Sequence, residues 1–122
     1  MRVILQCNRY TKIKHMLHAL QFMSVRQRLY YNVNVFIFKI LNGMASEALN
    51  NKIEIVGGEC DTQTRQTGNL VVTFRRTRSA QKSLFYEDIK MYNSLPTVIK
   101  QCRELVAFKR LLKKYISVNI NI

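Results

Sequence analysis

The sequence feature that most constrains the fold is the spacing of apolar residues late in the chain. Between residues 105 and 115 they recur at steps of three and four, the repeat of an α-helix with one buried face. This stripe consists of Leu105, Phe108, Leu111, Leu112 and Tyr115. Basic residues occupy the other faces, so the pattern predicts a helix that docks with one side and keeps positive charge in solvent. The chain's only proline, Pro96, is expected to set the bend into this helix.

A second helical pattern covers residues 25–42, between Ser24 as a predicted N-cap and Gly43 as a predicted C-terminal stop. One apolar stripe comprises Val25, Leu29, Val33, Phe36, Ile37, Ile40 and Leu41, and a second comprises Tyr31, Val35 and Phe38. Two stripes predict a central helix that is buried on two sides. The periodicity over five turns outweighs the strand propensity of residues 33–37.

Shorter elements are expected around these two helices. Residues 1–7 have the pattern of the last turns of a helix, which favours a chain that is a fragment of a longer protein. Thr11 is a predicted cap for a helix to residue 20, Ser46 for one to about residue 53, and Ser83 or Leu84 opens one to about residue 93. Residues 54–69 are predicted to be an internal mobile loop, rich in turn formers from residue 57 onward, and residues 70–74 an extended segment against helices. The expected fold is mainly α, a single small domain over 1–122 with about five helices.

The charge of the chain indicates a polyanionic partner. The sequence has 20 Lys and Arg against 7 Asp and Glu, a net charge of +13. Such an imbalance suits nucleic acid or an acidic membrane face, and the alternative is a charged, solvated surface. Residues 1–46 contain only basic charges, residues 47–61 are acidic on balance, and residues 62–122 are basic again, which predicts two cationic surfaces. The apolar run 29–38 is too short to span a bilayer, so we expect no membrane partner.

The candidate contacts to an RNA or DNA backbone form two groups. Arginine forks and nearby hydroxyl groups suit phosphate oxygens. The predicted binding residues are Arg75, Arg76, Arg78 and Lys82 in the first group, and Lys109, Arg110, Lys113 and Lys114 in the second. A solvated basic turn is the alternative for the first group.

Cysteine and histidine spacing predicts neither a disulfide framework nor a metal site. Cys7, Cys60 and Cys102 are odd in number, widely spaced and not preceded by a secretory signal, so we expect reduced thiols in the cytoplasm or nucleus. His15 and His18 lie three residues apart, but no CxxC pair or nearby carboxylate completes a ligand set. We therefore expect no metal and no cofactor in this chain.

Two blocks of sequence resemble the end of the reverse-transcriptase polyprotein of jockey-like non-LTR retrotransposons of animals. The first block matches at Tyr92, Asn93, Ser94, Leu95, Pro96, Phe108, Lys109, Leu112, Lys113 and Tyr115. The second matches at Leu20, Phe22, Met23, Val25, Arg28, Lys39, Leu41, Asn42, Gly43, Ala45 and Leu49. The chain departs from the family where it has Phe22 and Tyr92 in place of frequent tryptophans and Ser46 in place of a proline. The resemblance implies a fragment downstream of the polymerase core of an enzyme that copies element RNA into DNA.

The sequence lacks the groups that this chemistry needs. Reverse transcriptases hold two divalent ions with converging aspartates, and no Asp-Asp pair is present. Glu87 and Asp88 are adjacent, and on a helix they point about 100° apart. We therefore expect no catalytic residue and no enzyme activity from this chain alone, but a basic accessory region that binds nucleic acid. The alternatives are a helical interaction module that docks on the separate polymerase core, and a degenerate element copy without function.

Overall fold

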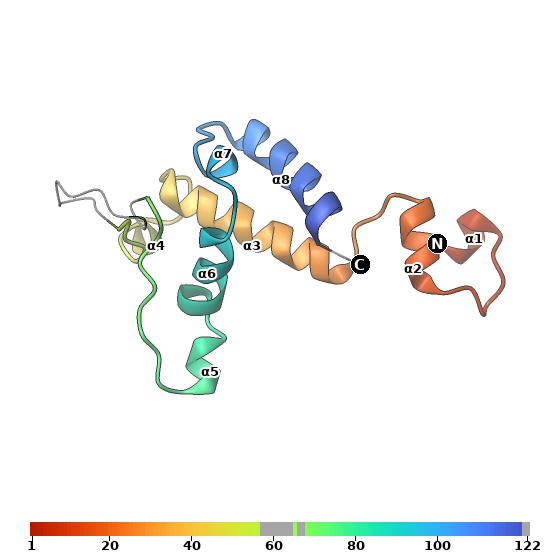
Figure 1. Ribbon diagram of the computed structural model, residues 1–122, viewed down its shortest axis with the longest axis horizontal. Helices are drawn as coiled ribbons and strands as arrows, with labels where there is room; N and C mark the ends of the chain where they lie inside the picture. Colours follow the sequence, from red (N-terminus) through yellow and green to blue (C-terminus); the bar gives the residue numbers. More distant parts are fainter. Residues whose placement is uncertain (57–64, 66–67, 121–122) are drawn as a thin grey trace.

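Helices dominate the computed structural model, which describes residues 1–56, 65 and 68–120. In chain order they are α1 (Arg2–Leu5), α2 (Ile13–Ala19), α3 (Val25–Leu41), α4 (Glu47–Asn50), α5 (Arg78–Gln81), a π-helical turn (Leu84–Asp88), α6 (Ile89–Asn93), α7 (Thr97–Lys100) and α8 (Leu105–Asn119) (Figure 1). The prediction of a mainly α fold is confirmed. The described residues form eight α-helices and not about five, because several of them are single turns.

The central helix α3 begins and ends where the sequence predicts. The Ser24 hydroxyl accepts a hydrogen bond from the Gln27 backbone N–H at 3.2 Å, and the Ser24 N–H donates to Gln27 Oε1 at 2.9 Å. This reciprocal capping box satisfies two N–H groups that have no partner within the helix. At the other end, Gly43 has a φ of 69°, the left-handed conformation that glycine adopts without strain.

The buried face of α3 differs from the predicted stripe. Val25 and Leu29 are 80% and 60% exposed, and Phe36 is 39% exposed, so the prediction that these three residues are buried was wrong. The buried arc contains Ile37, Phe38 and Ile40, and at its centre lie two polar residues, Gln27 and Asn34. Phe36 lies roughly 160° around the helix from Asn34, given about 100° per residue. Apolar spacing could not locate an arc whose centre is polar.

Helices α6 and α8 both pack against α3. Phe38 of α3 stacks on Phe108 of α8, with ring centroids 4.2 Å apart and planes 21° from parallel. Near the start of α3, Gln27 Nε2 donates a 2.7 Å hydrogen bond to the Ile120 carbonyl just beyond α8. The two helices therefore run antiparallel. The predicted α8 stripe is confirmed, with Phe108, Leu112 and also Ile116 completely buried.

The extended segment after the loop is attached to the core at its first residue. Leu70 is buried and forms an isolated antiparallel bridge with Ile55. The side chain of Asn93, at the end of α6, donates to the Leu70 carbonyl at 2.9 Å and accepts from the Leu70 N–H at 2.8 Å. Val72 still packs against the core, and Phe74 beyond it is exposed. Residues 57–64 and 66–67 of the predicted loop, including Cys60, lie outside the described residues, so its mobility stays a prediction; Cys7 and Cys102 are free thiols.

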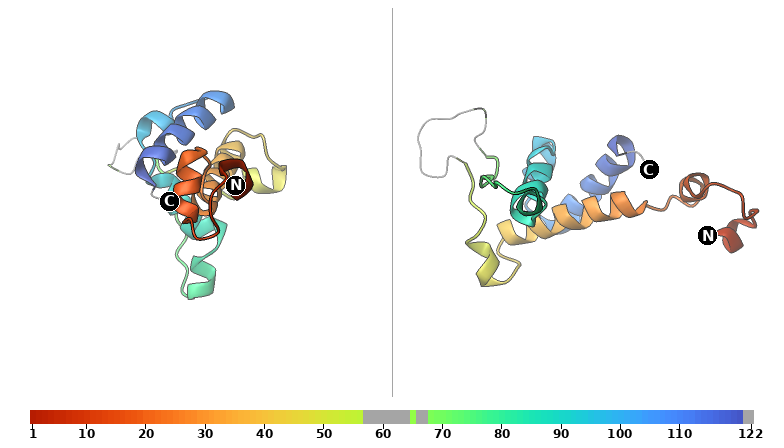
Figure 2. Two further views of the ribbon diagram at one scale, coloured as in Figure 1. Left: turned by 90° about the vertical axis from the view of Figure 1, so that its right-hand side faces the viewer. Right: turned by 90° about the horizontal axis from the view of Figure 1, so that it is seen from below.

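Residues 1–23, here called the arm, contain α1 and α2 and project from the end of the body at which α3 begins (Figures 1 and 2). The predicted Thr11 cap was wrong, because α2 has Lys12 at its N-cap and no capping side chain. Of α2, only Met16 is buried, and it is not part of the main core cluster.

Three other predicted helix limits are revised. The helix after Ser46 is a single turn that ends at Asn50, without a capping bond from Ser46. The helix after Ser83 begins as predicted, but its first turn is π-helical. One turn, α7, follows Pro96 before α8 begins. None of the helices in the described ranges combines the length and apolarity needed to cross a bilayer.

Candidate nucleic-acid interface

The outer face of α8 presents the densest group of exposed cations among the predicted site residues. Arg110, Lys113 and Lys114 are exposed, and Lys109 is half-buried at the edge of the helix interface. Leu105–Asn119 contains no acidic residue, so these charges have no carboxylate partner within their own helix. Because the inner face of α8 is fixed in the core, the cations are held on a rigid support and not on a loop.

An aromatic ring from α3 lies beside this face. Lys113 Nζ is 5.8 Å from the centroid of the Tyr31 ring, within the range of a cation–π interaction. Arg28 lies three residues before Tyr31, so both are on one side of α3. We call Arg28, Tyr31, Lys109, Arg110, Lys113 and Lys114 the α8 surface. It combines cations for phosphate groups with one ring that a base could contact.

The other predicted group lies on the extended segment and α5. Thr77 caps α5 by accepting from the Ala80 N–H at 3.3 Å, and Gln81 Nε2 donates to the Arg75 carbonyl at 2.9 Å. These contacts make a closed turn that the sequence prediction missed, although Thr77 followed by polar residues is a capping signal. Arg76, Arg78 and Lys82 extend from this turn into solvent.

Arg75 differs from its neighbours. Its side chain is half-buried, and its Nε is a buried donor that has no hydrogen-bond partner among the described residues. A phosphate group at this position would satisfy the donor only if it reached into the protein. The structure therefore places three of the four predicted residues of this group, Arg76, Arg78 and Lys82, where a backbone phosphate has direct access.

The structure does not bring the two predicted groups together. Helices α5 and α8 lie on opposite sides of α3 and α6, in two perpendicular views (Figures 1 and 2). A straight segment of nucleic acid that contacts the α8 surface does not reach Arg76 and Arg78. The eight predicted residues thus form two separate surfaces.

The Tyr92–Pro96 block has a structural role in this fold. Tyr92 and Leu95 are buried in the core, and Asn93 holds the Leu70 backbone. Lys100 adds to this contact by donating to the Asn93 carbonyl at 2.7 Å and to Asn69 Oδ1 at 3.0 Å. Burial lowers the pKa of the Lys100 ammonium group and raises the pKa of the Tyr92 hydroxyl group to about 12. The role of Lys100 was not predicted from the sequence, because its partners are distant along the chain.

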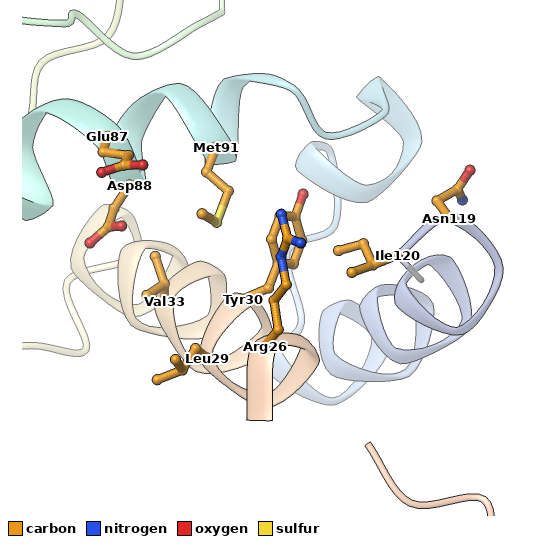
Figure 3. Close-up of a pocket in the computed structure, with 9 residues that line it drawn as sticks. All are labelled: Arg26, Leu29, Tyr30, Val33, Glu87, Asp88, Met91, Asn119 and Ile120. Carbon is orange, nitrogen blue, oxygen red and sulfur yellow. The ribbon is translucent and has the colours of Figure 1, made fainter. Parts of the chain in front are cut away.

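An open groove of about 670 Å³ lies between α3, the π-turn, α6 and the end of α8 (Figure 3). Leu29, Tyr30, Val33, Met91 and Ile120 provide its apolar lining. Glu87 and Asp88 lie at one end, Asn119 lies at the other, and Arg26 lies between these ends (Figure 3). Burial, and then the charge of Glu87, raises the pKa of the Asp88 carboxyl group. Within the described residues, no three His, Cys, Asp or Glu side chains are grouped to hold a metal ion.

Comparison with known proteins identifies no relative: no family model, curated protein or solved structure matches this chain.

Proposed function

We propose that this chain is a basic accessory module that binds the nucleic-acid backbone through the α8 surface. The observation that carries the proposal is the arrangement of α8. Its apolar face is completely buried at Phe108, Leu112 and Ile116, and its solvent face presents cations without an acidic residue in the helix. Such a face attracts phosphate groups electrostatically and reads no base sequence.

The turn around α5 is a second, weaker contact in this proposal. A nucleic acid bound to the α8 surface reaches Arg76, Arg78 and Lys82 only if it bends around the body. Otherwise these residues would have to bind a second strand. The sequence resemblance supports an origin downstream of the polymerase core of a jockey-like reverse transcriptase. In that setting the polymerase core supplies the catalytic aspartates and this region supplies affinity for the RNA or DNA, in the cytoplasm or nucleus.

A single charge reversal tests the proposal. Binding of the full chain to a labelled single-stranded RNA is measured by fluorescence anisotropy at low salt. Lys113→Glu should weaken binding about tenfold, because it removes one phosphate contact and adds repulsion. Lys52→Glu makes the same change in net charge at an exposed position outside the α8 surface, and should change affinity less than about threefold. Equal losses for both variants would mean that only net charge matters and that α8 is not the site.

The exposed apolar residues of α3 favour a second candidate function, docking on the polymerase core. Val25 and Phe36 lie on the face that neither α6 nor α8 covers. Exposed apolar patches of this kind mark protein interfaces. Binding of the purified polymerase core that is lost in Phe36→Asp and retained in Lys113→Glu would select this function.

A further inference from the structure

Several apolar residues of the arm are exposed, although Met16 of α2 is buried. Val3 is 91% exposed and Ile13 is 57% exposed, and neither α1 nor α2 packs extensively on another helix of the described structure. The arm leaves the body along the direction of α3 (Figure 2). Exposed apolar side chains such as these gain stability when another surface covers them.

The groove between α3, α6 and the end of α8 complements the arm in apolar surface and in charge. Its lining is mainly apolar, and Leu29, which contributes to it, is 60% exposed. The acidic residues Glu87 and Asp88 lie at one end of the groove, whereas the arm contains Arg2, Arg9, Lys12 and Lys14 and no acidic residue. Burial and the neighbouring carboxylate disfavour the charged form of Asp88, and an incoming cation would favour that form.

The position of the groove identifies the occupant. Arg26 and Leu29, in the first turns of α3, line the groove, so it opens at the end of the body from which the arm emerges. The arm projects away from the body where α3 begins (Figures 1 and 2), so a second copy that faces this end would meet it. Two copies facing each other with these ends can exchange arms around a twofold axis, which makes both contacts equivalent.

We propose that two copies of this chain form a dimer by arm exchange, with α2 of each copy seated in the groove between α3, α6 and α8 of the other. Ile13, the exposed apolar residue of α2, covers Leu29 and Met91, and the exposed Lys12 and Lys14 beside it reach Glu87 and Asp88. Each arm thereby buries apolar surface that is exposed in the single chain, and the acidic end of each groove gains cationic partners.

The test measures the mass of the full chain in solution. Sedimentation equilibrium of nuclease-treated protein, at a salt concentration that removes residual nucleic acid, distinguishes the 14.4 kDa monomer from a dimer of twice that mass. The variants are Ile13→Asp in the arm, Leu29→Asp in the groove and Val106→Asp as the control, an equally drastic change on the exposed side of α8. All three positions are exposed, and circular dichroism checks that the body stays folded.

We expect a dimer for the wild type and for Val106→Asp, and at least about tenfold weaker dimerisation for both Ile13→Asp and Leu29→Asp. An equal mixture of the two weakened variants should regain part of the affinity, because one intact arm then meets one intact groove. A monomer at all concentrations, a dimer that resists either substitution, or a mixture that regains nothing would overturn the proposal. The last result would indicate that each arm folds back onto its own groove.

Discussion

Asn93 holds the backbone of Leu70 through both of its amide atoms, donating to the carbonyl at 2.9 Å and accepting from the N–H at 2.8 Å. The contact joins the end of α6 to a segment 23 residues earlier in the chain. It satisfies the backbone of a residue that is only 3% exposed and that, within the described part of the chain, takes part in an isolated bridge and not in a sheet. A side chain thus replaces the hydrogen bonds that a strand would supply.

Asn93→Ala should therefore lower the free energy of unfolding by about 2–3 kcal/mol, because it leaves a buried N–H and a buried C=O without partners. Urea denaturation followed by circular dichroism measures the change. Asn32→Ala, at an exposed position of α3, is the matched control and should cost less than about 0.5 kcal/mol. A similar loss in both variants would show that the Asn93 contact adds no stability.

Neighbouring apolar residues of α3 should respond very differently to truncation. Ile37→Ala should cost about 2–5 kcal/mol, since the side chain is completely buried between helices. Phe36→Ala should cost less than about 1 kcal/mol, although apolar spacing placed both residues on one stripe. Tyr30→Ala should fall between them, because Tyr30 is half-buried against the core. Thermal or urea unfolding of the three variants checks the order, and a larger loss for Phe36 than for Ile37 would contradict the packing described for α3.

Stability at high pH should depend on Tyr92. Burial raises the pKa of its hydroxyl group to about 12 in the folded chain, compared with about 10 in the unfolded chain. The unfolded state then loses its proton first, so the contribution of Tyr92 is complete below pH 10 and is lost as the pH rises to 12. Tyr92→Phe removes this titration. The difference in unfolding free energy between wild type and variant should change between pH 10 and 12 in favour of the variant, and a constant difference would rule out a raised pKa.

Local sequence patterns predicted where the helices of this fold lie better than which side of each helix is buried. Ser24, Gly43 and the α8 stripe could be read directly, because capping and helical periodicity act over a few residues. The buried arc of α3 could not be predicted in this way. Gln27 at its centre is buried with its side chain hydrogen-bonded to the Ile120 carbonyl, 93 residues away, and such a contact leaves no local pattern.

The candidate site was likewise only partly predictable from local sequence. The basic residues were evident from composition, whereas their separation onto two sides of the body depends on the tertiary arrangement. The contact of Lys113 with Tyr31 joins residues from different helices and has no local signal. The roles of Asn93 and Lys100 likewise depend on Asn69 and Leu70, which the fold brings next to α6 and α7.

The separation of the two basic groups limits how steeply binding should depend on salt. Six phosphate contacts would require the α5 turn and the α8 surface to act on one strand. The α8 surface alone offers three to four contacts, which predicts a slope of log K against log salt of about −2 to −4, at roughly 0.7–0.9 per contact. Affinities for unrelated RNA sequences should be similar, because phosphate groups carry no sequence information.

The most direct test of the account is this salt slope, measured for the wild type and two double charge reversals with equal change in net charge. Arg110→Glu with Lys113→Glu should weaken binding strongly and reduce the slope by about 1.4–1.8, the equivalent of two contacts. Arg76→Glu with Arg78→Glu should have the smaller effect, because these residues lie on the other side of the body. A wild-type slope near zero, or a greater loss in the Arg76 and Arg78 variant, would contradict the assignment of α8 as the nucleic-acid interface.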